Sequence, residues 1–225
     1  MIYINKNYSE KSEHQLGEVL KILSFMKQQI PNILTIFRIL IIPVLIFSFY
    51  IPGFLANVVV AFLFMIASIT DFFDGYFARS LKAQSNFGKC LDPIADKLLV
   101  IVAITMLIHF GNKNMAITIP GLIIICREIL VSGLREFLAT INVGVPVSKL
   151  SKYKTAVQMT AITLLLLGKQ GSVYAVSEIL GEEARNIKFM IASYVTMAGE
   201  ILFLIAAILT IITGYIYLKV GLKNM

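Results

Sequence analysis

Six runs of apolar residues constrain the fold of this 225-residue chain more than any other feature of its sequence. The runs cover residues 33–50, 55–78, 91–110, 115–138, 155–167 and 189–218. A helix of about 20 apolar residues crosses the hydrocarbon core of a bilayer, and the fifth run approaches that length only if it begins near Ser151. Apolar residues make up 58% of the chain and charged residues 15%, which is unusual for a soluble domain. The pattern therefore predicts an all-α integral membrane protein with six transmembrane helices.

The residues before the first run predict a separate element. Residues 1–15 are mostly polar, and apolar residues then recur at helical spacing from Leu16 to Ile30. Such a stripe is typical of an amphipathic helix that lies in the membrane interface, and Pro31 ends it. We therefore divide the chain into a polar tail with an N-terminal amphipathic interfacial helix, residues 1–30, and a six-helix membrane domain, residues 31–225.

The basic residues outside the runs predict the orientation in the membrane. The net charge is +7, and the Lys and Arg residues of membrane proteins concentrate in cytoplasmic connections. If both termini are cytoplasmic, most of these residues fall on the cytoplasmic side. We expect a protein of the cytoplasmic membrane that contacts anionic lipids. A dense basic run with interleaved aromatic residues is absent from the sequence, so we expect no nucleic-acid partner.

Four aspartates lie at the cytoplasmic edge of two neighbouring runs. Asp71 and Asp74 share a helix face near the end of the second run, and Asp92 and Asp96 share one at the start of the third. Carboxylates at this depth usually mark function, and four together repel one another unless cations neutralise them. Clustered oxygen ligands suit Mg²⁺, Mn²⁺ or Ca²⁺, and two such ions can clamp the oxygens of a phosphoryl displacement. The alternative is ordinary helix ends, with Asp92 as an N-cap before Pro93.

The same aspartates belong to a longer pattern of residues at fixed spacing. The pattern comprises Asp71, Asp74, Gly75, Ala78, Arg79, Gly88, Asp92 and Asp96. At every position it matches the signature of the CDP-alcohol phosphotransferase family, which the chain resembles over about residues 30–218. The resemblance implies a membrane enzyme, generally a homodimer, that transfers a phosphatidyl group from CDP-diacylglycerol to an alcohol.

The resemblance also implies roles for individual residues. Two divalent cations, Mg²⁺ or Mn²⁺, would be held by Asp71, Asp74, Asp92 and Asp96. Asp96 would in addition act as the general base that takes the proton of the acceptor hydroxyl. The residues assigned to CDP-diacylglycerol are Asn32, Thr35, Gly75, Ala78, Arg79 and Gly88.

A group of basic residues predicts which kind of alcohol serves as the acceptor. Arg38 is charged within an apolar run, where it either meets an anion or extends to the interface. Arg127 and Arg135 are eight residues apart, so about two helical turns place them on one side of the fourth helix. Such a basic pocket suits an acceptor that carries a phosphate. The residues assigned to that phosphate are Arg38, Arg127, Arg135, Lys149, Lys152 and Lys154.

These basic residues resemble the phosphatidylglycerophosphate synthase branch of the family, whose acceptor is sn-glycerol 3-phosphate. That branch has a Gly-Lys-x-Lys-Thr run before the fifth helix, and here Ser151 stands in place of the glycine. Short bacterial members begin just before the Pro-Asn pair at 31–32, so both Met1 and Met26 are open as the start. The resemblance implies an enzyme of a bacterial-type cytoplasmic membrane that forms phosphatidylglycerophosphate and releases CMP.

Two alternatives remain open. A sibling enzyme would use the same carboxylates with serine, inositol phosphate or phosphatidylglycerol as its acceptor. A divalent-cation transporter would use the four aspartates as its pathway, although transporter sites usually lie near the midplane of the bilayer. These aspartates cluster at one edge of their runs, which favours the enzyme.

Overall fold

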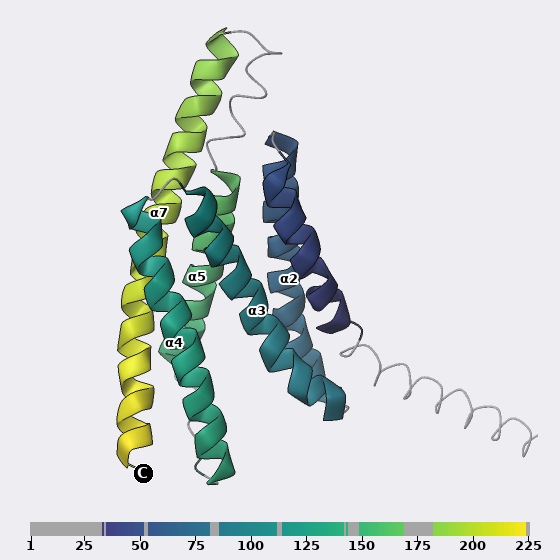
Figure 1. Ribbon diagram of the computed structural model, residues 1–225, viewed down its shortest axis with the longest axis vertical. Coiled ribbons are helices and arrows are strands. Elements are labelled where there is room, and N and C mark those ends of the chain that lie inside the picture. Colours follow the sequence, from purple (N-terminus) through teal and green to yellow (C-terminus); the bar gives the residue numbers. More distant parts are fainter. Residues whose placement is uncertain are drawn as a thin grey trace, which may run out of the picture.

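The computed structural model describes residues 33, 35–51, 54–81, 86–111, 114–141, 143, 149–168 and 182–223. These residues form six helices and no strand (Figure 1). The helices are Thr35–Tyr50, α2 (Phe54–Leu81), α3 (Asn86–Phe110), α4 (Met115–Thr140), α5 (Lys149–Leu167) and α7 (Glu182–Lys223). The all-α prediction is confirmed for this part of the chain, whereas the predicted amphipathic helix in residues 1–30 lies outside it.

Two of the described helices are long and apolar enough to cross a membrane, judged by length and composition. They are Met115–Thr140, which is α4, and the segment Met190–Lys223 of α7. Thr35–Tyr50 and the segment Asn57–Thr70 of α2 are shorter apolar helices. The described residues therefore agree with a membrane-associated protein, and the count of six transmembrane helices stays a prediction.

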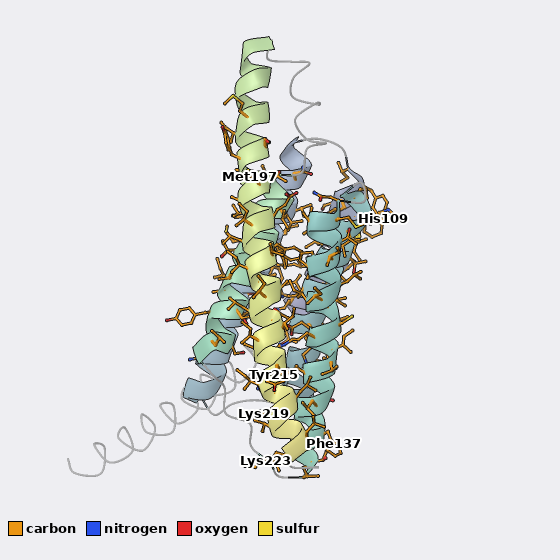
Figure 2. The ribbon with its side chains drawn as sticks, turned by 90° about the vertical axis from the view of Figure 1, so that its left-hand side faces the viewer. His109, Phe137, Met197, Tyr215, Lys219 and Lys223 are labelled. Carbon is orange, nitrogen blue, oxygen red and sulfur yellow. The ribbon has the colours of Figure 1, made fainter. Side chains whose placement is uncertain are left out.

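Apolar side chains fill the interior of the helix bundle and also cover its outside. Side chains that are fully buried come from every helix and include Leu45, Phe64, Ile104, Ile124, Ile162 and Phe203. Large apolar residues also point outward, among them Phe137 and Met197, which Figure 2 labels. Soluble proteins rarely expose so much apolar surface, whereas lipid tails would cover it favourably.

The helix α7 packs against both α4 and α5. At the start of α4, Asn114 donates a hydrogen bond from Nδ2 to Oε1 of Glu200 in α7 at 2.6 Å. Farther along the same two helices, Arg127 donates from Nη2 to Oγ1 of Thr213 at 3.1 Å. Both pairs are separated by 86 residues in the sequence. The equal offset means that α4 and α7 keep one constant register. The two helices run in the same direction, as Figure 1 shows.

Two glycines let α5 and α7 approach closely. A Cβ atom on Gly168 would lie 2.9 Å from the backbone nitrogen of Thr196, and one on Gly199 would lie 3.0 Å from the side chain of Leu165. Small residues at a contact allow helix backbones to pack closely, which is common where helices meet in membranes. The close approach fixes the position of α5 relative to α7.

The observed helix starts correct two details of the predicted segments. α3 begins at Asn86, so Asp92 and Pro93 lie inside the helix and the interpretation of Asp92 as an N-cap is wrong. α5 begins at Lys149 rather than at residue 155, so Lys152 and Lys154 belong to its first turns. In both cases the helical backbone continues beyond the apolar run, because its hydrogen bonds do not require apolar side chains.

Candidate active site

The four predicted metal-binding aspartates belong to two consecutive helices. Asp71 and Asp74 lie in the last part of α2, and Asp92 and Asp96 lie in the first half of α3. The two helices are in contact, and only residues 82–85 separate them along the chain. Outside the described set lie the side chains of Asn32, Asp71, Asp74, Ala78, Arg79, Asp92 and Lys149 and the surroundings of Gly75 and Gly88. Within the described set no three potential metal ligands come together, so the predicted metal site stays a prediction.

Asp96 is the predicted metal-binding aspartate whose side chain the structure describes. It is half-buried in α3, and its charge acts on the ammonium group of Lys154 in α5. Lys154 is itself only 3% exposed. The structure therefore brings the predicted general base and a predicted acceptor-binding lysine into the same region of the interior.

Glu128 of α4 connects two of the predicted basic residues. Its Oε1 accepts one hydrogen bond from Nζ of Lys154 and another from Nη1 of Arg127, the second at 3.3 Å. The side chains of Arg127 and Glu128 are only 13% and 18% exposed. Charges withdrawn from water need a partner of opposite sign, and this carboxylate provides one for both cations. Glu128 is absent from the predicted site, although a carboxylate within an apolar run was a signal for it.

Arg127 and Arg135 lie on the same side of α4, as their spacing predicts. Their guanidinium carbons lie 5.7 and 5.8 Å from the centre of the Tyr217 ring in α7. A guanidinium group within about 6 Å of an aromatic centre is in the range of cation–π attraction. Tyr217 and the Arg127 partner Thr213 are both missing from the predicted site. No feature of the sequence sets either of them apart from the other residues of the last apolar run.

The structure also places three other predicted residues. Thr35 and Arg38 lie about one turn apart in the first helix, each is 1% exposed, and each takes part in polar or charged interactions. The alternative in which Arg38 extends to the interface is wrong, because protein atoms cover almost all of its side chain. Lys152 is exposed on α5, which puts it outside the buried group.

We refer to five described charged residues of α3, α4 and α5 as the polar cluster. Its members are Asp96, Arg127, Glu128, Arg135 and Lys154. The cations outnumber the carboxylates, so the cluster as described is net positive. Arginine and lysine bind phosphate through charge-assisted hydrogen bonds. The cluster is therefore suited to hold an anionic group beside a carboxylate that can accept a proton.

Glu128→Gln should destabilise the protein, because Arg127 and Lys154 would lose the negative charge that compensates them. We expect the free energy of unfolding to fall by about 1–3 kcal/mol, as measured by thermal unfolding of the purified protein in detergent. Glu136→Gln is the matched control, because Glu136 is exposed on the same helix and should change stability by less than about 0.5 kcal/mol. Equal unfolding temperatures for the two variants would contradict the role of Glu128.

The similarity to known proteins covers both the described residues and residues outside them. The family model of CDP-alcohol phosphatidyltransferase matches residues 28–213. A Rickettsia felis protein named CDP-diacylglycerol–glycerol-3-phosphate 3-phosphatidyltransferase is 50% identical over 192 residues, which cover 85% of this chain and 94% of that protein. A protein of the same name from Rickettsia bellii is 52% identical over 192 residues, with the same coverage of 85% and 94%. A third, from Cereibacter sphaeroides, is 40% identical over 219 residues and covers 89% of this chain and 98% of that protein.

Proposed function

Because the chain belongs to the CDP-alcohol phosphatidyltransferase family, we propose that it transfers the phosphatidyl group of CDP-diacylglycerol to sn-glycerol 3-phosphate and releases CMP. The names of its relatives support this acceptor. The structural observation that supports it is the ion pair between Lys154 and Glu128 in the interior of the bundle. The basic residues of the polar cluster would bind the acceptor phosphate while the acceptor hydroxyl approaches Asp96.

In the proposed reaction Asp96 accepts the proton of the acceptor hydroxyl. The hydroxyl oxygen attacks the β-phosphorus of CDP-diacylglycerol, and the bond between that phosphorus and the bridging oxygen of CMP breaks. The electron pair of that bond leaves with CMP, and the product is phosphatidylglycerophosphate. Arg127, Arg135 and Lys154 hold the acceptor phosphate, which orients the hydroxyl for attack and reduces the entropy lost in the transition state.

The motif aspartates have the chemistry required for two divalent cations. Four carboxylates provide the hard oxygen ligands that Mg²⁺ and Mn²⁺ prefer, and adjacent helices carry them. We therefore propose that Asp71, Asp74, Asp92 and Asp96 hold these ions. When bound, the ions would stabilise the negative charge on the phosphate oxygens.

The remaining residues of the two sequence patterns are proposed substrate contacts. Those for CDP-diacylglycerol are Asn32, Thr35, Gly75, Ala78, Arg79 and Gly88. Those for the acceptor phosphate, besides the polar cluster, are Arg38, Lys149 and Lys152. Family membership favours this enzyme over a divalent-cation transporter, and the names of the relatives favour glycerol 3-phosphate over the acceptors of sibling enzymes.

We also propose that six transmembrane helices place the site at the cytoplasmic face of a bacterial-type cytoplasmic membrane. The excess of basic residues on one side of the predicted segments and the apolar outer surface support this arrangement. The family resemblance supports a homodimer, and the mass of the purified protein–detergent complex in light scattering would test it.

The acceptor assignment predicts which alcohol supports CMP release. Purified protein given CDP-diacylglycerol, Mg²⁺ or Mn²⁺, and one alcohol at a time should release CMP with glycerol 3-phosphate. Arg127→Ala should raise the KM for glycerol 3-phosphate by about 10- to 100-fold, because it removes a charge-assisted contact. Lys219→Ala, which changes an exposed basic residue of α7, is the control (Figure 2). Release of CMP with serine but not with glycerol 3-phosphate would assign the chain to a sibling activity.

The proposed roles of the aspartates predict that their substitution lowers activity in two different ways. Asp96→Asn should lower kcat by about 10²–10⁴-fold while CDP-diacylglycerol binding stays measurable, because an amide cannot accept the proton. Asp71→Asn, Asp74→Asn and Asp92→Asn should each abolish CMP release, and a chelator should abolish it in the parent protein. Glu136→Gln should keep the parental rate. Full activity of the parent in excess chelator would rule out the metal-dependent mechanism.

The proposed orientation predicts opposite labelling at the two ends of α4. Met115 and Thr140 are both exposed and mark these ends. In a chain without the native Cys90 and Cys126, Met115→Cys should react with a membrane-impermeant thiol reagent only from outside the cell. Thr140→Cys should react only from the cytoplasmic side, in inverted vesicles. The reverse pattern would overturn the orientation.

A further inference from the structure

The C-terminal half of α7 contacts the two arginines of the polar cluster. Thr213, Gly214 and Tyr217 lie within about one helical turn, and each either contacts or makes room for an arginine of α4. We call these three residues the α7 cradle. The two helices are in contact, and Figure 1 shows them side by side along this region.

Thr213 presents an accepting oxygen to Arg127. Its side chain is buried, and its hydroxyl donates a hydrogen bond to the backbone carbonyl of Leu209 at 2.8 Å. Because the hydroxyl hydrogen is engaged there, lone pairs of Oγ1 are available to Nη2 of Arg127 at 3.1 Å. Glu128 accepts from Nη1 of the same guanidinium group. The orientation of that group is therefore fixed by acceptors on two different helices.

Tyr217 contacts both guanidinium groups through its ring. The residue is 4% exposed, and the two cations lie 5.7 and 5.8 Å from its ring centre. An aromatic face attracts cations, so this ring stabilises two positive charges that would otherwise repel each other. Arg135 is an exposed residue, so contact with this buried ring restrains a side chain that solvent would otherwise leave free.

Gly214 provides space for the aliphatic part of Arg127. A Cβ atom at this position would lie 3.1 Å from Cγ and 3.7 Å from Nε of Arg127. That Nε is buried and donates a hydrogen bond to no group among the described residues. Buried donors are nearly always paired in folded proteins. With Nη1 and Nη2 engaged by Glu128 and Thr213, an acceptor phosphate is a suitable partner for Nε.

From these contacts we propose that Thr213 and Tyr217 are positioning residues, which orient Arg127 and Arg135 toward the acceptor phosphate. The inference rests on the proposed function. An unrestrained arginine samples many rotamers, and a site binds more tightly when its groups are already held in the bound geometry. The cradle therefore lowers the KM for the acceptor without contacting the reacting atoms.

Steady-state CMP release with varied glycerol 3-phosphate tests the role of Tyr217. Tyr217→Leu should raise the KM for glycerol 3-phosphate by about five- to thirty-fold, the range expected for lost cation–π contacts. The kcat and the KM for CDP-diacylglycerol should stay close to the parental values. Tyr217→Phe keeps the ring and should restore the KM. Tyr215→Leu is the matched control, because Tyr215 is 66% exposed on the same helix (Figure 2).

A second pair of variants tests Thr213 and decides the inference if Tyr217→Leu does not fold. Thr213→Val removes the accepting oxygen at nearly constant volume and should raise the KM for glycerol 3-phosphate by about tenfold. Thr213→Ser keeps the oxygen and should not. Equal KM values for the valine and serine variants would contradict the role of Thr213.

Failure of this inference and failure of the proposed function give different results. A parent protein that releases no CMP with glycerol 3-phosphate contradicts the proposed function before any variant is compared. An active parent whose Tyr217→Leu variant keeps the parental KM, or loses only kcat, contradicts positioning. In a chain that carries Arg127→Ala and Arg135→Ala, Tyr217→Leu should have no further effect on the KM, because Tyr217 acts through these arginines. A full additive effect there would also overturn the inference.

Discussion

The carboxylate of Glu128 compensates two positive charges in the interior of the helix bundle, and the polar cluster depends on it. A buried cation without a partner is strongly unfavourable, so the positions of Lys154 and Arg127 require this carboxylate. The interactions of these two cations then extend to the neighbouring helices. Arg127 reaches Thr213 on α7, and the charge of Asp96 on α3 acts on Lys154 of α5. Ion pairs and hydrogen bonds of Glu128 and Arg127 thus join α4 to α5 and to α7 in one polar region.

Polar contacts determine which face of each helix turns toward the interior, because the burial of apolar side chains hardly favours one face over another. Where lipid surrounds a bundle, an apolar side chain is stable on either side of a helix, so packing and polar contacts determine which side faces inward. α5 shows the result in two adjacent residues: Tyr153 is 68% exposed, whereas Lys154 is 3% exposed. The charged residue lies inside and the aromatic residue outside, the reverse of the usual order in a soluble protein. The arrangement that orients the helix also assembles the proposed acceptor site.

Helix positions could be predicted from the sequence because the apolar runs are long, and the shared side of Arg127 and Arg135 follows from their spacing alone. Which helix packs against the two arginines could not be predicted from the sequence, because helix packing depends on segments that are distant in the chain. Tyr217 and Tyr215 belong to the same run, yet they are 4% and 66% exposed. The alternative of an N-cap at Asp92 is wrong because the helix already begins at Asn86, before the apolar run does. The metal site stays a prediction, since most of its side chains lie outside the described residues.

The equal sequence offset of the two contacts between α4 and α7 restricts insertions and deletions in these helices. Asn114 with Glu200, and Arg127 with Thr213, mark two levels that are separated by the same number of residues in both helices. One residue inserted between the levels in one helix would rotate everything beyond it by about 100° and shift it by about 1.5 Å. The cradle would then turn away from the arginines. Between these levels α4 and α7 can therefore change length only together, and independent variation in length is confined to the segments beyond them.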